Sequence, residues 1–385
     1  MKYKNLFTLA ICVGFMSSQA FGQPNPKNPL LLYDHVVFYD GYLNENNPDK
    51  DLDDGILRHS TSLYSVKMTD KQLKKIGDKL DMNVFVTACC DNYDRIGNIN
   101  LALVPKGKAS YKPDEVERIE IARFITPFMD KNKEPNTVPY HYNVDNLSPI
   151  LRDKNLRKKY DFWLEYEIFG VPYAANKQIE GCEGRSDTFA GTLEFETSGK
   201  TGSTSGNILV PIVIKKPETI GNNLNNYNEA ATDTIGKTTK TYVFNVPENV
   251  KDARIILITS NHGANRGGEE YIRRDHFVYY DNGLIMQYKP GRQSCEPFRE
   301  RNTQRNGIYG KRGEDGKFSY EPYSDEEWQS FSNWCPGDVI DTRMIMLGNV
   351  KKGEHKIRIS VPDAEFADQQ GDFPVSMYFH GMKAK

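Results

Sequence analysis

Short runs of β-branched and aromatic residues recur along the chain, and clusters of Gly, Pro, Asn and Asp separate them. Such runs, at a spacing of roughly 8 to 12 residues, are typical of strands in antiparallel sandwiches. They fall at 83–86, 99–104, 119–124, 160–169, 208–214, 241–246, 254–259, 276–280, 284–288 and 355–361. Helical periodicity is limited to 71–80 and 148–159. The pattern therefore predicts an all-β chain.

A segment rich in Gly, Ser and Thr at 197–206 divides the predicted strands into two sets. A flexible composition between two strands is typical of a linker. The chain has 385 residues, and one domain usually holds about 150 residues. We therefore expect two antiparallel sandwiches or jelly rolls, one on each side of this segment.

The first 22 residues have the pattern of a secretory signal peptide. Lys2 and Lys4 precede an apolar segment at 6–16, and small residues at 18–22 offer a cleavage site. The apolar segment is too short to cross a hydrocarbon core of about 30 Å. We expect a secreted or periplasmic protein, with no membrane span in the rest of the chain.

The charge balance narrows the class of partner. The chain carries 50 Lys and Arg against 52 Asp and Glu, which gives a formal net charge of -2. Binding to nucleic acid or to a membrane surface depends on a basic excess, so neither partner is expected. The expected partner is neutral. If it contains sugar rings, the 22 Tyr must carry more of the recognition than the 3 Trp.

If the protein is secreted, its cysteines can form disulfides. Cys12 would leave with the signal peptide, and five cysteines would remain in a compartment where disulfides persist. They are Cys89, Cys90, Cys182, Cys295 and Cys335. Because five is odd, one thiol is free or pairs between chains. The sequence has no Cys-x-x-Cys and its histidines are scattered singly, so no metal site is expected.

Two stretches place carboxylates beside arginines on predicted loops. In the first, Asp91, Asp94 and Arg95 follow two cysteines and lie between two predicted strands. An oriented carboxyl with a partner that sets its pKa is what general acid-base catalysis requires. In the second, at 262–276, glycines allow a ligand to approach the backbone, and adjacent glutamates face an arginine cluster. For both stretches, a solvated loop of ion pairs is the alternative.

A third candidate is an alternating strand at 163–169. Alternation places Trp163, Glu165, Glu167 and Phe169 on one face of the sheet. Two glutamates between aromatic residues are costly to bury. We therefore expect that face to be a solvated groove.

In these stretches the sequence resembles the secreted bacterial peptide-N-glycosidase F family, amidases that remove N-linked glycans from glycoproteins. Any one of the matching motifs is weak, but their order along the chain is specific. They are 90–95, 97–100, 122–128, 209–213, 270–276 and 334–337.

The resemblance implies two adjacent eight-stranded antiparallel jelly-roll domains, with the active site at their junction. It covers most of the chain after the signal peptide, from about Leu57 onward. The expected domains are therefore 57–203 and 204–385. Residues 23–56 have no clear counterpart and are expected to be an N-terminal extension.

The resemblance also implies roles for individual residues. The primary catalytic aspartate matches Asp94. The second carboxylate matches Glu270, since the spacing to the following arginine and histidine selects it over Glu269. A third glutamate matches Glu167, with Glu165 as the alternative. The residues expected to bind substrate are Arg95, Asp91, Glu165, Trp163, His262, Glu269, Arg274 and Trp334.

The cysteines and one arginine depart from the family pattern. Cys295 and Cys335 match a long-range disulfide of the second domain. Where the family has a small bridged loop, this chain has adjacent Cys89 and Cys90. Either these two form a vicinal disulfide, or one of them joins Cys182 in the insertion at 174–187. A bridge expected at Gly268 and Ile272 is missing, and Phe331 replaces an expected arginine.

The implied activity is hydrolysis of the side-chain amide of glycosylated Asn, without metal or cofactor. This reaction needs a carboxylate base and a positioned hydrogen-bond donor. The expected substrate is an N-linked glycoprotein or glycopeptide, and a monomer is expected. A glycan-binding protein without turnover and an endo-glycosidase with paired carboxylates are the alternatives.

Overall fold

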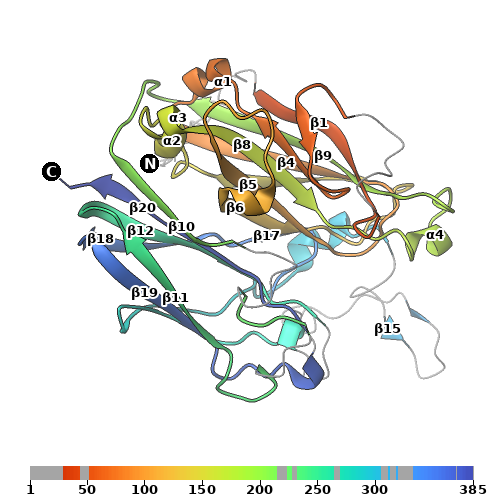
Figure 1. Cartoon of the computed structure of the whole chain (residues 1–385). Helices are drawn as coiled ribbons and strands as arrows, with labels where there is room; N and C mark the ends of the chain where they lie inside the picture. The colour runs from red at the N-terminus through yellow and green to blue at the C-terminus, as the bar shows by residue number, and fades with distance from the viewer. Residues whose placement is uncertain are drawn as a thin grey trace, which may run out of the picture.

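The computed structural model describes residues 29–43, 52–214, 223–227, 232–263, 269–304, 311–312, 318–319, 333–369 and 371–384. The predicted signal peptide at 1–22, Gly268 and Phe331 lie outside these ranges. Antiparallel sheets dominate the described residues, in two sandwich domains, which confirms the predicted fold class. Figure 1 shows the first domain in red to green and the second in green to blue. No helix among the described residues could span a membrane.

Four short helices lie outside the sheets. They are α1 (Asp70–Lys75), α2 (Ser148–Leu151), α3 (Leu156–Lys159) and α4 (Ala175–Gln178). The capping box of Thr69 and Gln72 starts α1. The helix predicted at 71–80 was too long, because its last two residues begin a strand whose alternate residues are buried.

The first domain is a sandwich of two antiparallel sheets. One has the strand order β1 (Leu30–Tyr39), β9 (Asp187–Ser198), β4 (Lys79–Ala88), β7 (Thr137–Asn143). The other has the order β17 (Val339–Ile340), β6 (Glu117–Ile125), β5 (Ile96–Pro105), β8 (Tyr160–Ile168), β3 (Leu63–Lys67), β2 (Ile56–Arg58).

Alternation along the strands explains the core of this domain. Every second residue of β4, from Leu80 to Val86, is fully buried. These side chains pack in one cluster with Phe162, Leu164 and Tyr166 of β8. The side chains at the positions between them point away from this core and can contact other parts of the protein.

Strand β1 corrects the assignment of residues 23–56 to an added segment. Leu30 to Tyr39 pairs with β9 as the edge strand of the first sheet. Tyr33 and Phe38 lie in the core cluster. Bulges in the pairing of β1 interrupt its alternation, which hid the strand from pattern analysis.

The second domain has two sheets of four strands each among the described residues. One has the order β10 (Asn207–Val213), β20 (Val375–Lys383), β12 (Val250–Thr259), β18 (Arg343–Val350). The other has the order β11 (Thr239–Val246), β19 (Gly353–Ser360), β13 (His276–Tyr280), β14 (Gly283–Tyr288). Strand β15 (Lys311–Arg312) pairs with β16 (Phe318–Ser319) in a separate antiparallel pair. The domain boundary at 203/204 stays a prediction.

The two domains are joined by pairing and by packing. Strand β17 comes from the second half of the chain, yet it pairs with β6 of the first domain (Figure 1). Beside it, Ile125 packs in a buried cluster with Ile258, Trp334 and Ile340. This apolar contact places the ends of β6 and β12 next to each other.

Two disulfides cross-link loops in the described part of the chain. Cys90 is bonded to Cys182, and Cys295 to Cys335. Cys89 is free, so the vicinal alternative is wrong. Burial and the charge of Asp187 raise the pKa of the Cys89 thiol to about 12, which makes it a poor nucleophile.

We predict that a non-reducing peptide map contains both cross-links and a free thiol at Cys89. The double variant Cys90→Ala/Cys182→Ala should lose about 2 to 5 kcal/mol of unfolding free energy in urea, because the bond closes a long loop. The control Cys89→Ser should lose about 1 kcal/mol or less. A cross-linked Cys89–Cys90 peptide would contradict the assignment.

Candidate active site

The loop between β4 and β5 is built around a buried carboxylate, Asp91. Its oxygens accept hydrogen bonds from the amides of Tyr93 (2.9 Å) and Val171 (2.6 Å). They also accept two from the guanidinium of Arg95, at 2.7 and 3.3 Å. The Arg95 amide in turn donates to Thr126 Oγ1 of the neighbouring segment (2.7 Å). Because Asp91 and Arg95 are both anchored, the residues between them are held in place.

Asp94 is one of the residues held between Asp91 and Arg95. Burial raises its pKa from 3.8 to about 6, although the charge of Arg95 acts in the opposite direction. From the sequence, we expected a loop in which a partner sets the pKa of an oriented carboxyl. The structure differs in that the guanidinium of Arg95 bonds to Asp91. The Asp94 carboxyl therefore lacks that ion pair.

The second carboxyl comes from the other domain, on the 3-10 turn η3 (Glu269–Tyr271). Glu270 accepts a hydrogen bond from the Gly263 amide and one from Tyr271. Burial and the nearby negative charge of Asp94 raise its pKa from 4.5 to about 7. Asp94 and Glu270 therefore interact electrostatically across the domain junction.

The neighbouring glutamate, Glu269, points to a different partner. Its carboxylate accepts hydrogen bonds from Arg274 at 2.7 and 3.2 Å. Its backbone oxygen accepts from the side-chain amides of Asn261 (2.9 Å) and Asn333 (2.8 Å). Glu269 and Arg274 thus hold the turn in place, while Glu270 is the one whose pKa responds to Asp94.

Gly263 allows the close approach that Glu270 needs. Its φ of +105° is in the region that favours glycine. A Cβ at this position would lie 2.4 Å from the Cα of Gly371 on the adjacent segment. A larger residue would push these backbones apart and move the amide that donates to Glu270.

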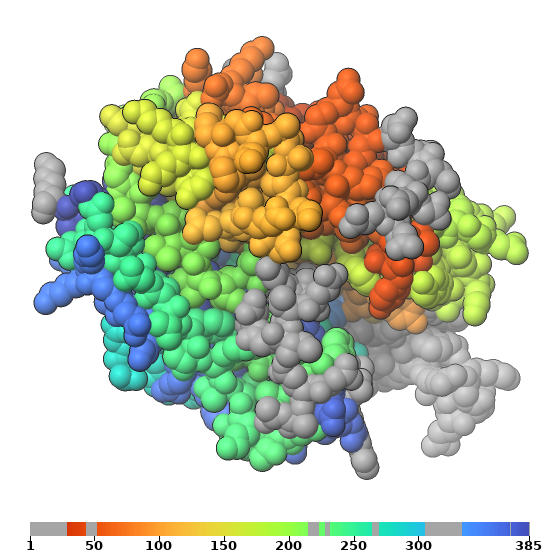
Figure 2. Space-filling model, in the orientation of Figure 1, coloured from red at the N-terminus to blue at the C-terminus, as the bar shows by residue number. Residues whose placement is uncertain are grey.

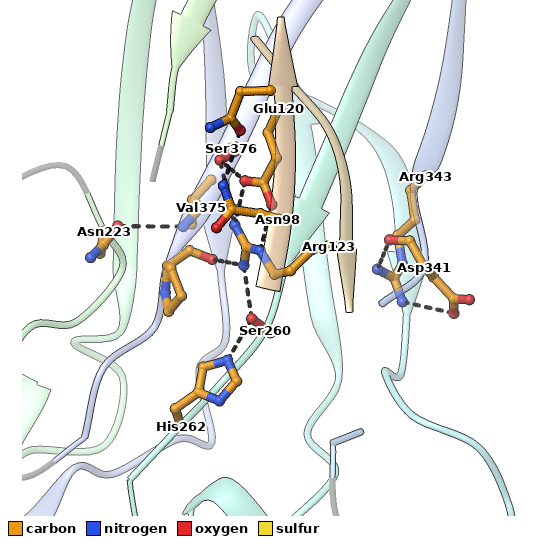
Figure 3. Close-up of polar contacts among 12 residues, drawn as sticks. Asn98, Glu120, Arg123, Asn223, Ser260, His262, Asp341, Arg343, Val375 and Ser376 are labelled. Atoms are coloured by element: carbon orange, nitrogen blue, oxygen red, sulfur yellow. Dashed lines mark hydrogen bonds and ion pairs between the residues drawn. The ribbon is translucent and has the colours of Figure 1, made fainter. Parts of the chain in front are cut away.

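A fully buried ion pair joins the two domains beneath this site. Arg123 of β6 makes two hydrogen bonds of 2.8 Å to the carboxylate of Glu120. It also donates to Ser260 Oγ (2.8 Å) and to the Pro374 carbonyl (3.0 Å) of the second domain. Ser376, also from the second domain, donates to Glu120. Figure 3 shows these contacts converging on the guanidinium.

The same network reaches His262, one of the predicted substrate-binding residues. Its Nε2 lies 2.7 Å from Ser260 Oγ (Figure 3). Its ring stacks on Trp334, with the ring centroids 5.5 Å apart. The indole of Trp334 donates to the carbonyl of Asn261 (2.9 Å). Trp334 is buried in the junction cluster, so it positions His262 and offers little surface to a ligand.

The outer face of β8 is not the solvated groove that alternation predicted. Glu165 is fully buried, with hydrogen bonds from Arg118 (2.7 Å), Tyr111 (2.9 Å) and Asn100 (3.0 Å). Trp163 packs against Tyr111 with ring centroids 5.6 Å apart. Through Tyr111, the loop after β5 therefore covers this face. Figure 2 shows this loop in orange on the surface.

Further along the same strand, Glu167 is only half-buried. It lies opposite Asn98 of β5 in the strand register. Two residues later, Phe169 opens the loop whose Val171 amide binds Asp91. Of the two glutamates considered on β8, Glu167 thus lies nearer the loop that carries Asp94, whereas Glu165 is covered by the loop that carries Tyr111.

Sequence analysis missed three residues near the carboxyls. Tyr271 bonds to Glu270, and the hydroxyl of Tyr227 would lie 3.1 Å from a Cβ at Gly263. Arg123 was noted only as part of a motif. The charged pair of Glu120 and Arg123 among the apolar residues of one strand is a signal that could have identified Arg123. Among the described residues, no group of three His, Cys, Asp or Glu could hold a metal ion, and the absence of a metal stays a prediction.

Comparison with solved structures shows the fold. The structure of PNGF-II in a C2 crystal form aligns with a TM-score of 0.62 and 18% identity, over 93% of this chain and 65% of that one. The structure of PNGase F, a glycosylasparaginase from Flavobacterium meningosepticum, aligns with a TM-score of 0.58 and 16% identity, over 93% and 96%. This chain thus spans slightly less than two thirds of the PNGF-II chain. Comparison with curated proteins gave no match.

Comparison with family models shows the family. The model described as Peptide-N-glycosidase F, N terminal, matches residues 31–183. The model described as Peptide-N-glycosidase F, C terminal, matches residues 226–380. Together these matches cover well over half of the chain and both of its sandwich domains. The chain therefore belongs to the peptide-N-glycosidase F family.

Proposed function

We propose that this protein hydrolyses the side-chain amide bond of a glycosylated asparagine. Water adds its oxygen to the amide carbon, the carbon–nitrogen bond breaks, and the glycan leaves as a glycosylamine. The asparagine becomes aspartate. The substrate is an N-linked glycoprotein or glycopeptide.

The observation that carries this proposal is the pair of carboxyls at the domain junction. Asp94 and Glu270 come from different domains, and burial raises both pKa values towards neutrality. Side chains with pKa values near the working pH are efficient proton donors and acceptors. Perturbed carboxyls that couple to each other are a signature of acid-base sites.

The two carboxyls have different roles in the proposed reaction. With the lower pKa, Asp94 is the ionised group at neutral pH and takes a proton from the attacking water. With the higher pKa, Glu270 retains its proton longer and can donate a hydrogen bond to the amide oxygen or to the leaving nitrogen. Tyr271 and the Gly263 amide hold Glu270 in position.

The remaining predicted residues support this chemistry. Glu167 is proposed to hold the innermost GlcNAc, because it lies on the strand that leads into the loop bound to Asp91. Arg95 and Asp91 fix the Asp94 loop as an ion pair. His262 contributes to the wall of the site beside Glu270. In contrast, burial removes Glu165 and Trp163 from direct contact with substrate.

The two disulfides indicate a protein of the extracellular space or the periplasm, because such bonds persist in oxidising compartments. As part of the proposal, residues 1–22 direct the chain there as a signal peptide. The protein is proposed to act as a monomer, since one chain supplies both carboxyls.

The experiment that tests the function is incubation with a denatured N-glycoprotein, followed by the mass of the glycosylated peptide. An amidase converts the linkage Asn to Asp and removes the whole glycan. A residual GlcNAc would indicate an endo-glycosidase and contradict the proposal. An unchanged glycopeptide that binds the protein would indicate a glycan-binding protein and would also contradict it.

We predict that Asp94→Asn lowers the rate of glycan release by about 10²-fold or more, because the general base is lost. The variant should fold. Since burial raises the pKa of Asp94, its ionisation destabilises the fold as pH rises through about 6. The Tm of the variant minus the Tm of wild type should therefore increase from pH 4 to pH 8. The control is Asp114→Asn, an exposed aspartate, and near-wild-type activity of Asp94→Asn would contradict the assignment.

We predict a bell-shaped pH profile of kcat/KM. Activity should fall below about pH 6 as Asp94 gains a proton, and above about pH 7 as Glu270 loses one. Glu270→Gln should be less active and should lose the alkaline limb, because Gln does not ionise. If activity of this variant still fell at alkaline pH, another group would cause that fall, which would contradict the role of Glu270.

A further inference from the structure

Exposed tyrosines gather on the first-domain side of the candidate site. Among the described residues, Tyr42 is 71% exposed and Tyr173 is 55% exposed, which is high for side chains of this size. Tyr42 follows β1, and Tyr173 lies in the loop after β8. Large exposed aromatic groups that cluster usually mark a binding surface.

A buried carboxylate fixes both tyrosines. Asp40 is 5% exposed and accepts a hydrogen bond from the amide of Tyr42 (3.1 Å). It also binds the hydroxyl of Tyr173. The Tyr42 ring stands edge-on to Phe169, with ring centroids 5.2 Å apart. Asp40 and Phe169 therefore hold the two tyrosines next to each other.

Glycine at position 41 permits this arrangement. A Cβ on Gly41 would lie 2.3 Å from the Phe169 ring. The Gly41 amide donates to the Gly170 carbonyl (2.9 Å), which ties the end of β1 to the loop after β8. Because the backbone approaches the ring so closely, a larger residue at position 41 would displace Phe169.

The aromatic surface is continuous with the proposed active site. The loop that carries it donates from the Val171 amide to Asp91 (2.6 Å) and accepts from Arg95 at the Val171 carbonyl (3.4 Å). Phe169 lies two residues beyond Glu167, the proposed contact of the innermost GlcNAc. On the opposite side, Tyr227 is near Gly263, and its pKa is raised by burial and by the charges of Asp372 and Glu270 and by Tyr42.

We propose that Tyr42, Tyr173 and Phe169 bind a sugar ring of the glycan beyond its innermost GlcNAc. This inference rests on the proposed function and extends it to a second subsite. Tyrosine offers a rigid apolar face for the C–H side of a pyranose and a hydroxyl for its polar edge. Among the described residues, the carboxylate that contacts the two tyrosines, Asp40, is buried and occupied by them. An uncharged ring therefore fits this surface.

The occupant is the glycan and not the peptide, because the surface extends from Glu167, on the side of the site proposed to hold the sugar. The N-terminal segment that carries Tyr42 supplies the outer wall. Residues 39–43 thus belong to the binding surface as well as to the edge of the first sheet.

The test compares two glycopeptides with the same peptide, one bearing a single GlcNAc and the other the core pentasaccharide Man3GlcNAc2. For Tyr42→Ala/Tyr173→Ala, KM should rise about tenfold for the pentasaccharide substrate, which corresponds to about 1.4 kcal/mol. KM for the single-GlcNAc substrate and kcat for both should stay unchanged. Tyr42→Phe/Tyr173→Phe, which keeps the rings, should retain most of the affinity. Val243→Ala, an exposed position on β11, is the control.

Calorimetric titration with the free pentasaccharide separates this inference from the proposed function. If the protein is not an amidase, wild type should still bind the pentasaccharide and the double alanine variant should bind it about tenfold more weakly. Equal binding by the two proteins would overturn the subsite. An equal rise of KM for both glycopeptides would also overturn it, since it would show a contact with the peptide or the first sugar.

Discussion

The buried pair of Glu120 and Arg123 is the interaction on which the arrangement of the two domains depends. Both side chains are fully buried. An unpaired guanidinium at this position would be very costly. Glu120 supplies the counter-charge from the same strand, but the remaining donors of Arg123 find Ser260 and the Pro374 carbonyl only in the other domain. Docking of the two domains therefore supplies hydrogen-bond acceptors for Arg123, which the first domain alone would leave unpaired or exposed to water.

The candidate site follows from this docking. Ser260 connects the ion pair to His262, and the next residue, Gly263, donates its amide to Glu270. Asp94 approaches from a loop held by the Asp91–Arg95 pair. Neither domain alone contains both carboxyls. The same burial that raises their pKa values makes their ionised forms destabilising, so acid-base capacity is obtained at some expense of stability.

The sequence predicted some features of the structure and not others. Strand periodicity gave the fold class, and the order of short motifs singled out Asp94 and Glu270 as candidates, which the fold brings to the domain junction. Alternation showed that Trp163 and Glu165 share a face, but it could not show that the loop with Tyr111 covers that face. Bulges concealed β1. Contacts between residues 137 or more positions apart, such as Arg123 with Ser260, have no local signal in a single sequence.

The central claim is that the junction brings Asp94 and Glu270 into one coupled site. Carbon-13 NMR titration of the two carboxyl groups tests it most directly. The structure predicts pKa values near 6 and 7 in wild type, and a fall in the pKa of Glu270 when Asp94 is replaced by Asn, since the neighbouring negative charge is removed. A Glu270 that titrates near 4.5, its ordinary value, in both proteins would contradict the claim.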